Sequence, residues 1–437
     1  MLVSGSVRDL DSPRRRTTGR HVRRALLAAL AVPTLLMAAA PAAGAATATV
    51  RAGSSVAGGE VVQEAVSFTV RNVNGTSIDC KTDGATYTVR GHITGTAQSL
   101  ADPQAVTLLL HGLSYGEFFS DFTAVPGYNF ADEQAQAGHV TVTVDRLGYG
   151  ASDKPVGENI CFGSRADIAH QMVQQLKAGS YSTAGAGSVK FPKVVLAGHS
   201  VGSIIAQTEA YTFGDIDGLM VMSYSDTDVS LGATAALAIA TQQCQAGGMR
   251  QHGDSGPAGY VWFGADTPEK FIEAHFYTPG ADPTVVNAVA AIRSEDPCGD
   301  ILSYKKAVAA DLANIGKITV PTLVLVGGRD AIYPVPATKQ ASLLTGTNDV
   351  TAVTIPDTGH ALAFHRSKDQ FQAQVSMWLA GHQFGGWAMP VGSADTGGGS
   401  TAAASHPALM GSGVLLLTLA GGVMLLAWRR YRSLPSR

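Results

Sequence analysis

The sequence places one serine in a setting that favours a nucleophilic role. Ser200 is the centre of the pentapeptide Gly198-His-Ser-Val-Gly202, which follows the apolar run 194–197 and precedes a segment that suits a helix. In such a G-x-S-x-G turn the glycines permit a tight, strained backbone that exposes the hydroxyl, and the helix N-terminus stabilises developing negative charge. The alternative is that Ser200 only caps the helix. We predict that Ser200 attacks an acyl group.

A serine hydroxyl needs a base that removes its proton, and a carboxylate that holds this base in one tautomer. The best of the 12 histidines for this role is His360, which lies in a loop after the apolar run 350–355. We predict that Asp330 is the acid, because it follows Gly327-Gly328 at the end of the buried run 322–326, where a charge needs a partner. Asp226 is the alternative acid. The less favoured histidines are His111 and His199, which lie inside turn motifs, and His365, which is expected to open a helix.

Six apolar runs, each bounded by turn signals, alternate with helical patterns through the middle of the chain. Runs of this kind suit strands that are buried on both faces of a parallel sheet. The clearest helix is predicted over 165–178, and the alternating segments 65–73 and 86–94 are predicted to be antiparallel edge strands. The pattern predicts an α/β fold with a mostly parallel sheet. The six runs are 105–110, 140–144, 194–197, 219–222, 322–326 and 350–355.

The alternation stops at about residues 226–312, where helix-like pieces occur without a strand of the sheet type. Structureless loops of this length are rare in compact domains. We therefore predict an inserted helical cap within a domain that covers residues 47–390.

Five motifs occur in the order and spacing of the α/β-hydrolase family, which the chain resembles over residues 62–385. The motifs are His111-Gly112 after a strand, the turn Asp145–Asp153, the Ser200 pentapeptide, Asp330 after a strand, and the His360 loop. The resemblance implies a mostly parallel eight-stranded sheet, a cap after the sixth strand, and a triad of Ser200, Asp330 and His360. It also implies that the backbone N–H groups of Leu113 and Val201 form the oxyanion hole.

The residues and the resemblance together favour a serine hydrolase that cleaves a carboxylic ester or related small-molecule acyl substrate through an acyl-enzyme. This mechanism needs no metal and no organic cofactor. Peptidases, lyases and perhydrolases use the same triad, and a non-catalytic surface binding protein on the same fold is the alternative from another class. Nine aromatic side chains either line an acyl pocket or pack between cap and core: Tyr115, Phe118, Phe119, Phe122, Trp262, Phe263, Phe271, Phe276 and Tyr277.

The charge distribution argues against a nucleic-acid partner. Residues 1–46 hold seven Arg and two Asp, and the tail after Pro407 holds four Arg and no acid. The rest of the chain has 20 basic and 32 acidic residues, so it carries a net charge of about −12 that repels phosphate backbones. With 45% hydrophobic and 15% charged residues, the chain is also too apolar to be disordered throughout.

The N-terminal residues 1–46 have the features of a secretory signal peptide. An Arg-rich stretch precedes the apolar segment 25–40, which gives way to small residues that suit cleavage near Ala45, Ala46 or Ala48. The sequence therefore predicts export, by either the general secretory or the twin-arginine route.

The C-terminal end has the features of a membrane anchor. Residues 408–428 carry no charge and are long enough to cross a bilayer, and the basic tail 429–437 is predicted to stay in the cytoplasm. Residues 391–407 form a polar, flexible tether. The sequence predicts a protein anchored to the cell membrane with its globular part outside. The segment Ser393–Gly397 resembles a sortase sorting signal without its leading Leu, so cell-wall attachment is the alternative.

The four cysteines form an even number in a chain that is predicted to reach an oxidising compartment, which favours two disulfides. Four cysteines permit three pairings. Cys244 and Cys298 both lie in the interrupted stretch 226–312, so we predict that they pair with each other. By elimination, Cys80 then pairs with Cys161. No C-x-x-C motif or Cys/His cluster suggests zinc.

Overall fold

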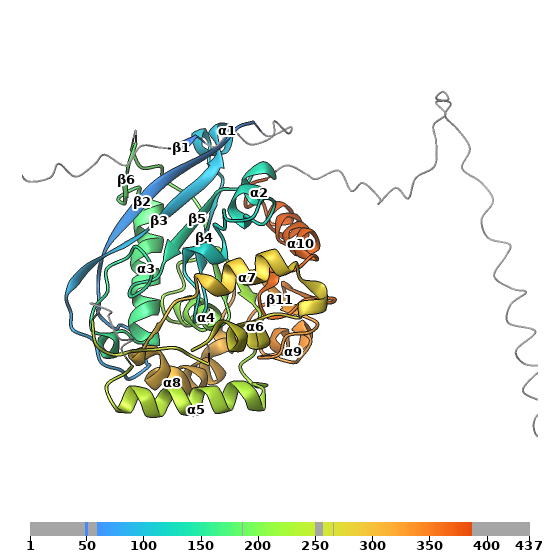
Figure 1. Ribbon diagram of the computed structural model, residues 1–437. Helices are drawn as coiled ribbons and strands as arrows, with labels where there is room; N and C mark the ends of the chain where they lie inside the picture. The colour runs from blue at the N-terminus through green and yellow to red at the C-terminus, as the bar shows by residue number, and fades with distance from the viewer. Residues whose placement is uncertain (1–48, 51–58, 186, 250–256, 265, 387–437) are drawn as a thin grey trace, which may run out of the picture. The chain divides into compact units, whose positions relative to one another are not determined.

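The structure is a computed structural model that describes residues 49–50, 59–185, 187–249, 257–264 and 266–386 (Figure 1). The predicted signal peptide (1–46), tether (391–407), membrane helix (408–428) and basic tail (429–437) lie outside these described residues. Among the helices of the described part, none combines the length and the apolar character needed to cross a membrane.

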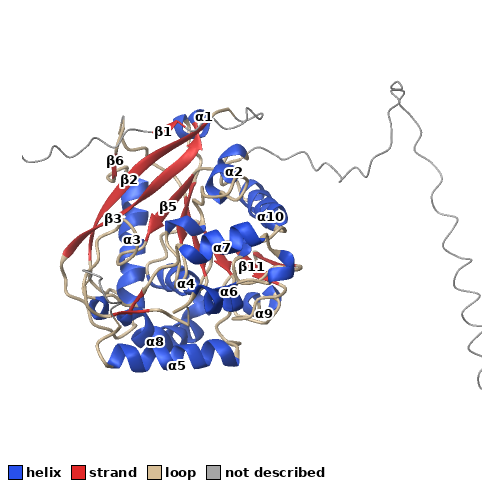
Figure 2. Ribbon diagram, viewed as in Figure 1, coloured by secondary structure: helices blue, strands red, loops and turns tan. Residues whose placement is uncertain are grey.

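The described residues form a ten-stranded sheet, whose eight longer strands follow the order β2-β3-β5-β4-β7-β8-β11-β12. Figure 2 shows the helices arranged around the strands. From β5 to β12 all neighbours are parallel, whereas β2, β3 and β5 pair antiparallel. The predicted mostly parallel α/β sheet is confirmed. The strands are β2 (Val61–Arg71), β3 (Thr86–Thr96), β4 (Val106–Leu110), β5 (Thr141–Asp145), β7 (Val194–His199), β8 (Gly218–Met222), β11 (Thr322–Gly327) and β12 (Val350–Ile355).

Two further strands were not expected from the sequence. β1 (Thr49–Val50) and β6 (Ser182–Thr183) are each two residues long and pair antiparallel with β2. They bring the strand number from the expected eight to ten. A two-residue strand has no hydrophobic periodicity, so the sequence contains no signal for it.

Ten helices accompany the sheet in the described residues. The helix that was predicted over 165–178 begins one turn earlier, at Phe162, where the hydroxyl of Ser164 accepts the backbone N–H of Cys161 at 3.2 Å. The helices are α1 (Ala97–Ala101), α2 (Phe130–Gln136), α3 (Phe162–Ala178), α4 (Val201–Thr212), α5 (Leu231–Gln245), α6 (Pro268–His275), α7 (Pro283–Ala291), α8 (Cys298–Asn314), α9 (Ala337–Ala341) and α10 (Lys368–Gly381).

The core lies on both faces of the sheet, because successive side chains of a strand point to opposite sides. In β7, Val194 and Leu196 belong to one buried cluster, together with residues of α3, α4 and α8. Val195 and Ala197 belong to the other, together with residues of α2 and α10. All six residues of β7 are buried, which explains why this strand reads as a continuous apolar run.

Between β8 and β11 the chain leaves the sheet and forms α5, α6, α7 and α8, as the interruption of the pattern predicted. We call residues 226–312 the inserted segment. It contains one small sheet in the described residues, in which β9 (Tyr260–Val261) pairs with β10 (Asp296–Pro297). The bond Cys244–Cys298 joins the end of α5 to the start of α8, with a Cα–Cα distance of 5.2 Å.

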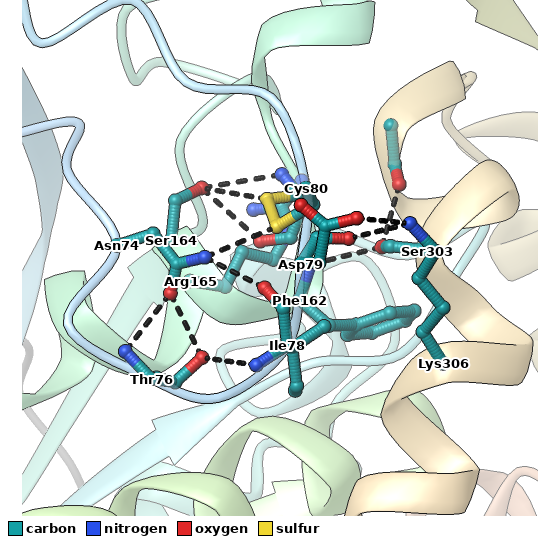
Figure 3. Close-up of a disulfide and its surroundings, with 12 residues drawn as sticks. Asn74, Thr76, Ile78, Asp79, Cys80, Phe162, Ser164, Arg165, Ser303 and Lys306 are labelled. Atoms are coloured by element: carbon teal, nitrogen blue, oxygen red, sulfur yellow. Dashed lines mark hydrogen bonds and ion pairs between the residues drawn. A yellow bond between two sulfur atoms is a disulfide. The ribbon is translucent and has the colours of Figure 1, made fainter.

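The second disulfide links the β2–β3 connection to the start of α3 (Figure 3). Cys80 pairs with Cys161, so both predicted pairings are confirmed. Next to the bond, the amide of Asn74 donates to the carbonyl of Ile78 at 2.7 Å. Lys306 of α8 forms an ion pair of 2.8 Å with Asp79, as Figure 3 shows. The β2–β3 connection is thus attached to two helices.

Candidate active site

Ser200 lies at the sharp turn between β7 and α4. Its φ of 55° and ψ of −127° place it in a region that non-glycine residues rarely adopt. A Cβ on Gly198 would lie 2.2 Å from the carbonyl oxygen of Gly202, and one on Gly202 would lie 2.2 Å from that of Leu110. Larger residues at either position would prevent this turn. The glycines therefore allow the strained backbone that carries Ser200.

Asp330 and His360 are brought together by two neighbouring parallel strands. Asp330 follows β11 and His360 follows β12, so both loops leave the same edge of the sheet. Nδ1 of His360 lies 2.9 Å from Oδ2 of Asp330, and both side chains are fully buried. Oδ1 of Asp330 accepts the backbone N–H groups of Ile332 and Tyr333 at 2.8 and 3.0 Å. The carboxylate is therefore fixed in the orientation that holds the imidazole.

The His360 loop is also attached to the nucleophile turn. Nε2 of His199, the residue before Ser200, donates to the carbonyl oxygen of His360 at 3.0 Å. Nε2 of His360 is buried and has no hydrogen-bond partner within the described residues. The pairing with Asp330 at Nδ1 thus leaves Nε2 available to accept a proton.

His365 fixes the backbone on both sides of His360. Its Nδ1 donates to the carbonyl of Ala361 at 2.8 Å, and its Nε2 accepts the N–H groups of Gly359 and Tyr277, each at 3.0 Å. Burial lowers the pKa of His365 to about 4, so the ring is neutral and Nε2 can accept. The sequence suggested that His365 opens a helix. It lies instead in the loop before α10, where it joins the loop that carries His360 to the inserted segment.

The peptide between Gly112 and Leu113 has a fixed orientation after β4. The carbonyl of Gly112 accepts a hydrogen bond of 3.1 Å from the guanidinium of Arg146 and contacts Nδ1 of His111 at 2.8 Å. A peptide bond is planar and trans, so fixing this carbonyl also fixes the N–H of Leu113 on the opposite side. Leu113 and Val201 line the same cavity as Ser200.

Both of these N–H groups are available to a ligand. Within the described residues, the N–H of Leu113 donates no hydrogen bond to another group of the chain. Val201 is the first residue of α4, so its N–H has no partner inside the helix. Two backbone N–H donors, those of Leu113 and Val201, thus lie at the cavity that Ser200 lines.

The inserted segment holds the next peptide of the same loop. Ser114 has a φ of 63°, and its N–H donates to Oδ1 of Asp296 at 2.7 Å. Its carbonyl accepts the N–H of Ser294 at 3.0 Å. The hydroxyl of Tyr149 donates to the same carboxylate oxygen of Asp296 at 2.9 Å. Both peptides that flank Leu113 are thus held by buried polar groups.

A narrow cavity of about 30 Å³ leads to Ser200. The inserted segment supplies most of its apolar lining, and His275, Asp300 and Tyr304 of the same segment also line it. A wider cavity of about 380 Å³ shares part of this lining and carries Lys270 and Glu273. The residues common to both cavities are Ala233, Phe263, His275 and Ile332.

The aromatic side chains mostly pack rather than line the substrate cavity. Of the nine aromatic residues considered from the sequence, all of which the structure describes, only Phe263 lines the cavity at Ser200. Tyr115, Phe119 and Phe271 are buried in the core, and Trp262 lines a separate hollow. Of the two roles that the sequence allowed, most of these side chains therefore take the packing role. Tyr115, in the loop after Leu113, packs against Phe271 and His275 of α6, at ring-centroid distances of 5.4 and 5.2 Å.

Asp226, the alternative acid, belongs to a different network. Its carboxylate accepts hydrogen bonds from Tyr224, Gln207 and Gln340, at 2.7, 3.3 and 2.6 Å. Gln207 belongs to α4 and Gln340 to α9. The carboxylate that contacts Nδ1 of His360 is that of Asp330. The geometry therefore favours Asp330.

Two polar residues of the site had no signal in the sequence. Asp296 contacts the loop that contains Leu113, as described above, and His275 lies beside His360 with a ring-centroid distance of 5.2 Å. Nδ1 of His275 contacts the hydroxyl of Tyr115 at 2.9 Å. Burial, with the neighbouring His360, lowers the pKa of His275 well below its ordinary value. His275 therefore faces the cavity as a neutral imidazole.

Comparisons with known proteins identify the family of the chain. The model of the alpha/beta hydrolase family matches residues 107–374. A thermophilic esterase from Thermogutta terrifontis has a similar structure, with a TM-score of 0.50 and 19% sequence identity, over 72% of this chain and 99% of that chain. An enol-lactonase from Burkholderia xenovorans LB400 gives a TM-score of 0.47 and 15% identity, over 67% of this chain and 97% of that chain.

A monoacylglycerol lipase from Paleococcus ferrophilus gives a TM-score of 0.45 and 18% identity, over 63% of this chain and 94% of that chain. None of the curated proteins compared with the sequence matches it significantly. The structural likenesses concern the fold, while the family match covers more than half of the chain. This chain belongs to the α/β-hydrolase family.

Proposed function

We propose that the protein is a serine hydrolase that cleaves a carboxylic ester, or a related acyl compound, through an acyl-enzyme. The observation that carries the proposal is the pair of His360 and Asp330, whose 2.9 Å contact leaves Nε2 of the imidazole without a partner within the described residues. Ser200 stands in the strained turn to which this histidine loop is bonded.

In the proposed mechanism, Nε2 of His360 takes the proton of Ser200 as its Oγ attacks the ester carbonyl. The negative oxygen then accepts hydrogen bonds from the N–H groups of Leu113 and Val201. His360 next gives its proton to the leaving alcohol, and the acyl group stays on Ser200. A water molecule, deprotonated by His360, releases the acid and restores the serine. Asp330 stabilises the imidazolium in both steps.

The cavity dimensions support a preference for small acyl groups. About 30 Å³ beside Ser200 holds only a few heavy atoms, and its lining is mainly apolar. The wider cavity of about 380 Å³ accommodates the other part of the ester. We therefore expect acetyl to butyryl esters to be better substrates than long-chain esters.

A series of p-nitrophenyl esters from acetate to palmitate tests the activity and the size preference together. We expect kcat/KM to fall beyond about four acyl carbons, and Ser200→Ala to abolish turnover. The substitution Ala233→Leu narrows the lining and is expected to lower kcat/KM for butyrate more than for acetate. A protein that hydrolyses none of the esters, nor lactone and peptide controls, would argue against a hydrolase.

We further propose that the protein is exported and held at the cell membrane by residues 408–428. Two disulfides within the described residues support export, because such bonds persist in oxidising compartments. Full-length protein is expected in the membrane fraction, and a chain that ends at residue 407 in the medium. Protease added to intact cells should remove the full-length protein, and complete protection would contradict the proposed orientation. Cell-wall attachment predicts instead that the protein sediments with peptidoglycan.

A further inference from the structure

Two groups of histidine and carboxylate side chains in the described residues bring their ligand atoms within 4.8 Å of one another. The first consists of His92, Glu117 and Asp121. It is internally bonded, because Oε1 of Glu117 contacts Nδ1 of His92 at 2.9 Å and accepts the hydroxyl of Thr143 at 2.6 Å. The amide of Gln63 donates to Asp121 at 3.0 Å. This group satisfies its own polar atoms and therefore needs no ligand.

The second group consists of His170, Glu209 and Asp215, which lie on α3, on α4 and in the loop after α4. The side chain of Glu209 is fully buried, whereas those of His170 and Asp215 are 29% and 20% exposed. One side of the group therefore faces solvent. The ring of Phe213 stacks on the imidazole of His170 at a centroid distance of 4.1 Å, which fixes the plane of the ring.

Four buried polar atoms converge in this group without a hydrogen-bond partner among the described residues. They are Nδ1 of His170, both carboxylate oxygens of Glu209, and Oδ1 of Asp215. Nδ1 of His170 lies 3.0 Å from Oδ2 of Asp215 and 3.9 Å from Oε1 of Glu209. A proton shared between the carboxyl groups of Glu209 and Asp215 supplies one hydrogen bond within the group. Because buried polar atoms normally have partners, the atoms that remain call for a further ligand.

A neighbouring lysine does not satisfy the carboxylates. Nζ of Lys177 forms an ion pair of 2.9 Å with Asp217 and donates to the backbone carbonyl of Asp215 at 2.5 Å. The carboxylate of Asp215 is contacted by the imidazole of His170 and by the side-chain amide of Gln174, both at Oδ2. Two carboxylates and one imidazole thus face one another next to solvent.

We propose that His170, Glu209 and Asp215 bind a divalent transition-metal ion, with Zn²⁺ as the expected occupant. One imidazole nitrogen with two carboxylate oxygens is a ligand set that suits Zn²⁺, whereas Mg²⁺ and Ca²⁺ prefer oxygen ligands alone. Ligand atoms around a tetrahedral ion with bonds of about 2.0–2.1 Å lie roughly 3.4 Å apart. The observed separations of 3.0 and 3.9 Å bracket this value. Water completes the coordination from the solvent side.

The ion would act structurally, because it joins α3 to the end of the helix that begins after Ser200. The inference is independent of the proposed hydrolase activity, and binding and stability are its readouts. Without an ion, burial and the neighbouring Asp215 raise the pKa of Glu209 to about 10. The carboxyl is then protonated at neutral pH, so Gln is a matched neutral replacement for it.

Isothermal titration calorimetry of the full-length, untagged protein, freed of metal with a chelator, tests the proposal. We expect one Zn²⁺ per chain with micromolar or tighter affinity. His170→Gln and Glu209→Gln should each weaken binding at least a hundredfold, and His92→Gln in the other group should leave it unchanged. Saturating Zn²⁺ should raise the Tm of the wild-type protein but not that of Glu209→Gln.

Three results would overturn the site. The first is that the wild-type protein binds no Zn²⁺ at 1 mM. The second is that both His170→Gln and Glu209→Gln bind Zn²⁺ with wild-type affinity. The third is that the wild-type protein binds Ca²⁺ more tightly than Zn²⁺. If the variants do not fold, X-ray absorption of the wild-type zinc complex decides. One imidazole with oxygen ligands supports the proposal, and two or more imidazoles, or sulfur, contradict it.

Discussion

The carboxylate of Asp296 accepts the backbone N–H of Ser114 at 2.7 Å, although the two residues lie 182 positions apart in the chain. Ser114 follows Leu113, the proposed oxyanion donor, and adopts a left-handed backbone conformation that costs free energy. Asp296 belongs to the inserted segment. A residue of this segment thereby positions the loop that is proposed to stabilise the transition state.

Loss of this acceptor should impair catalysis more than binding. Asp296→Ala leaves the N–H of Ser114 without its partner, so we expect kcat to fall about 10- to 100-fold, somewhat less than for removal of an oxyanion donor. KM should change little, and Asp296→Asn, which retains an acceptor oxygen, should recover most of the activity. Steady-state kinetics check this. Asp266→Ala, an exposed carboxylate of the same segment, is the matched control. Equal losses at both positions would refute the positioning role.

The same carboxyl should make stability depend on pH. Burial, opposed by the hydrogen bonds from Ser114 and Tyr149, raises the pKa of Asp296 from 3.8 to about 7. The native state binds this proton more tightly than the unfolded chain, so the contribution to stability is fully present below pH 3.8 and is lost as the pH rises to about 7.

The size of this effect follows from about 1.4 kcal/mol per pKa unit. The free energy of unfolding of the wild-type protein, relative to Asp296→Asn, should decrease by up to about 4 kcal/mol between pH 4 and pH 8. Urea denaturation of the two proteins across this range measures the difference. Parallel pH profiles would show that Asp296 has an ordinary pKa.

The two candidate acids should respond differently to substitution. Asp330→Asn removes the acceptor that fixes the tautomer of His360, so turnover should fall on the order of 10⁴-fold, the loss measured for the equivalent change in a serine protease. Asp226→Asn alters a network of Tyr224 and two glutamines, and activity should stay within about tenfold of wild type. Ester hydrolysis by folded variants decides. The reverse ranking would make Asp226 the acid.

The disulfide of the inserted segment should stabilise the protein because it restricts the conformations of the unfolded chain. Cys244 and Cys298 are 54 positions apart, and closing a loop of that length is worth about 4 kcal/mol in the chain-entropy estimate. The double substitution to Ala should lower the free energy of unfolding by about this amount. Urea denaturation of the oxidised wild-type protein and the variant tests it, and coincident curves would show that the bond contributes nothing.

Most of the sheet and the three central residues of the site were predictable from the sequence for the same reason. Each parallel strand is buried on both faces and therefore appears as a continuous apolar run, and the loops after such strands meet at one edge of the sheet. Ser200, Asp330 and His360 all lie in such loops.

The contributions of Asp296, His275 and His365 were not predictable. Asp296 and His275 reach the site only because the helices of the inserted segment fold back over the sheet, and helical patterns contain no information about that docking. His365 resembled a helix start because it precedes a helical pattern. Its contacts to Gly359 and Tyr277 depend on two segments that are adjacent only in the folded protein.

Labelling with a fluorophosphonate shows whether Ser200 is a nucleophile that His360 activates. The reagent forms a covalent bond only with an activated serine, and intact-mass and peptide analysis locate the adduct. We predict one adduct per chain, on Ser200, with loss of labelling in Ser200→Ala and strong slowing in His360→Gln. An unlabelled wild-type protein at neutral pH, or an adduct that persists in Ser200→Ala, would show that Ser200 is not an activated nucleophile.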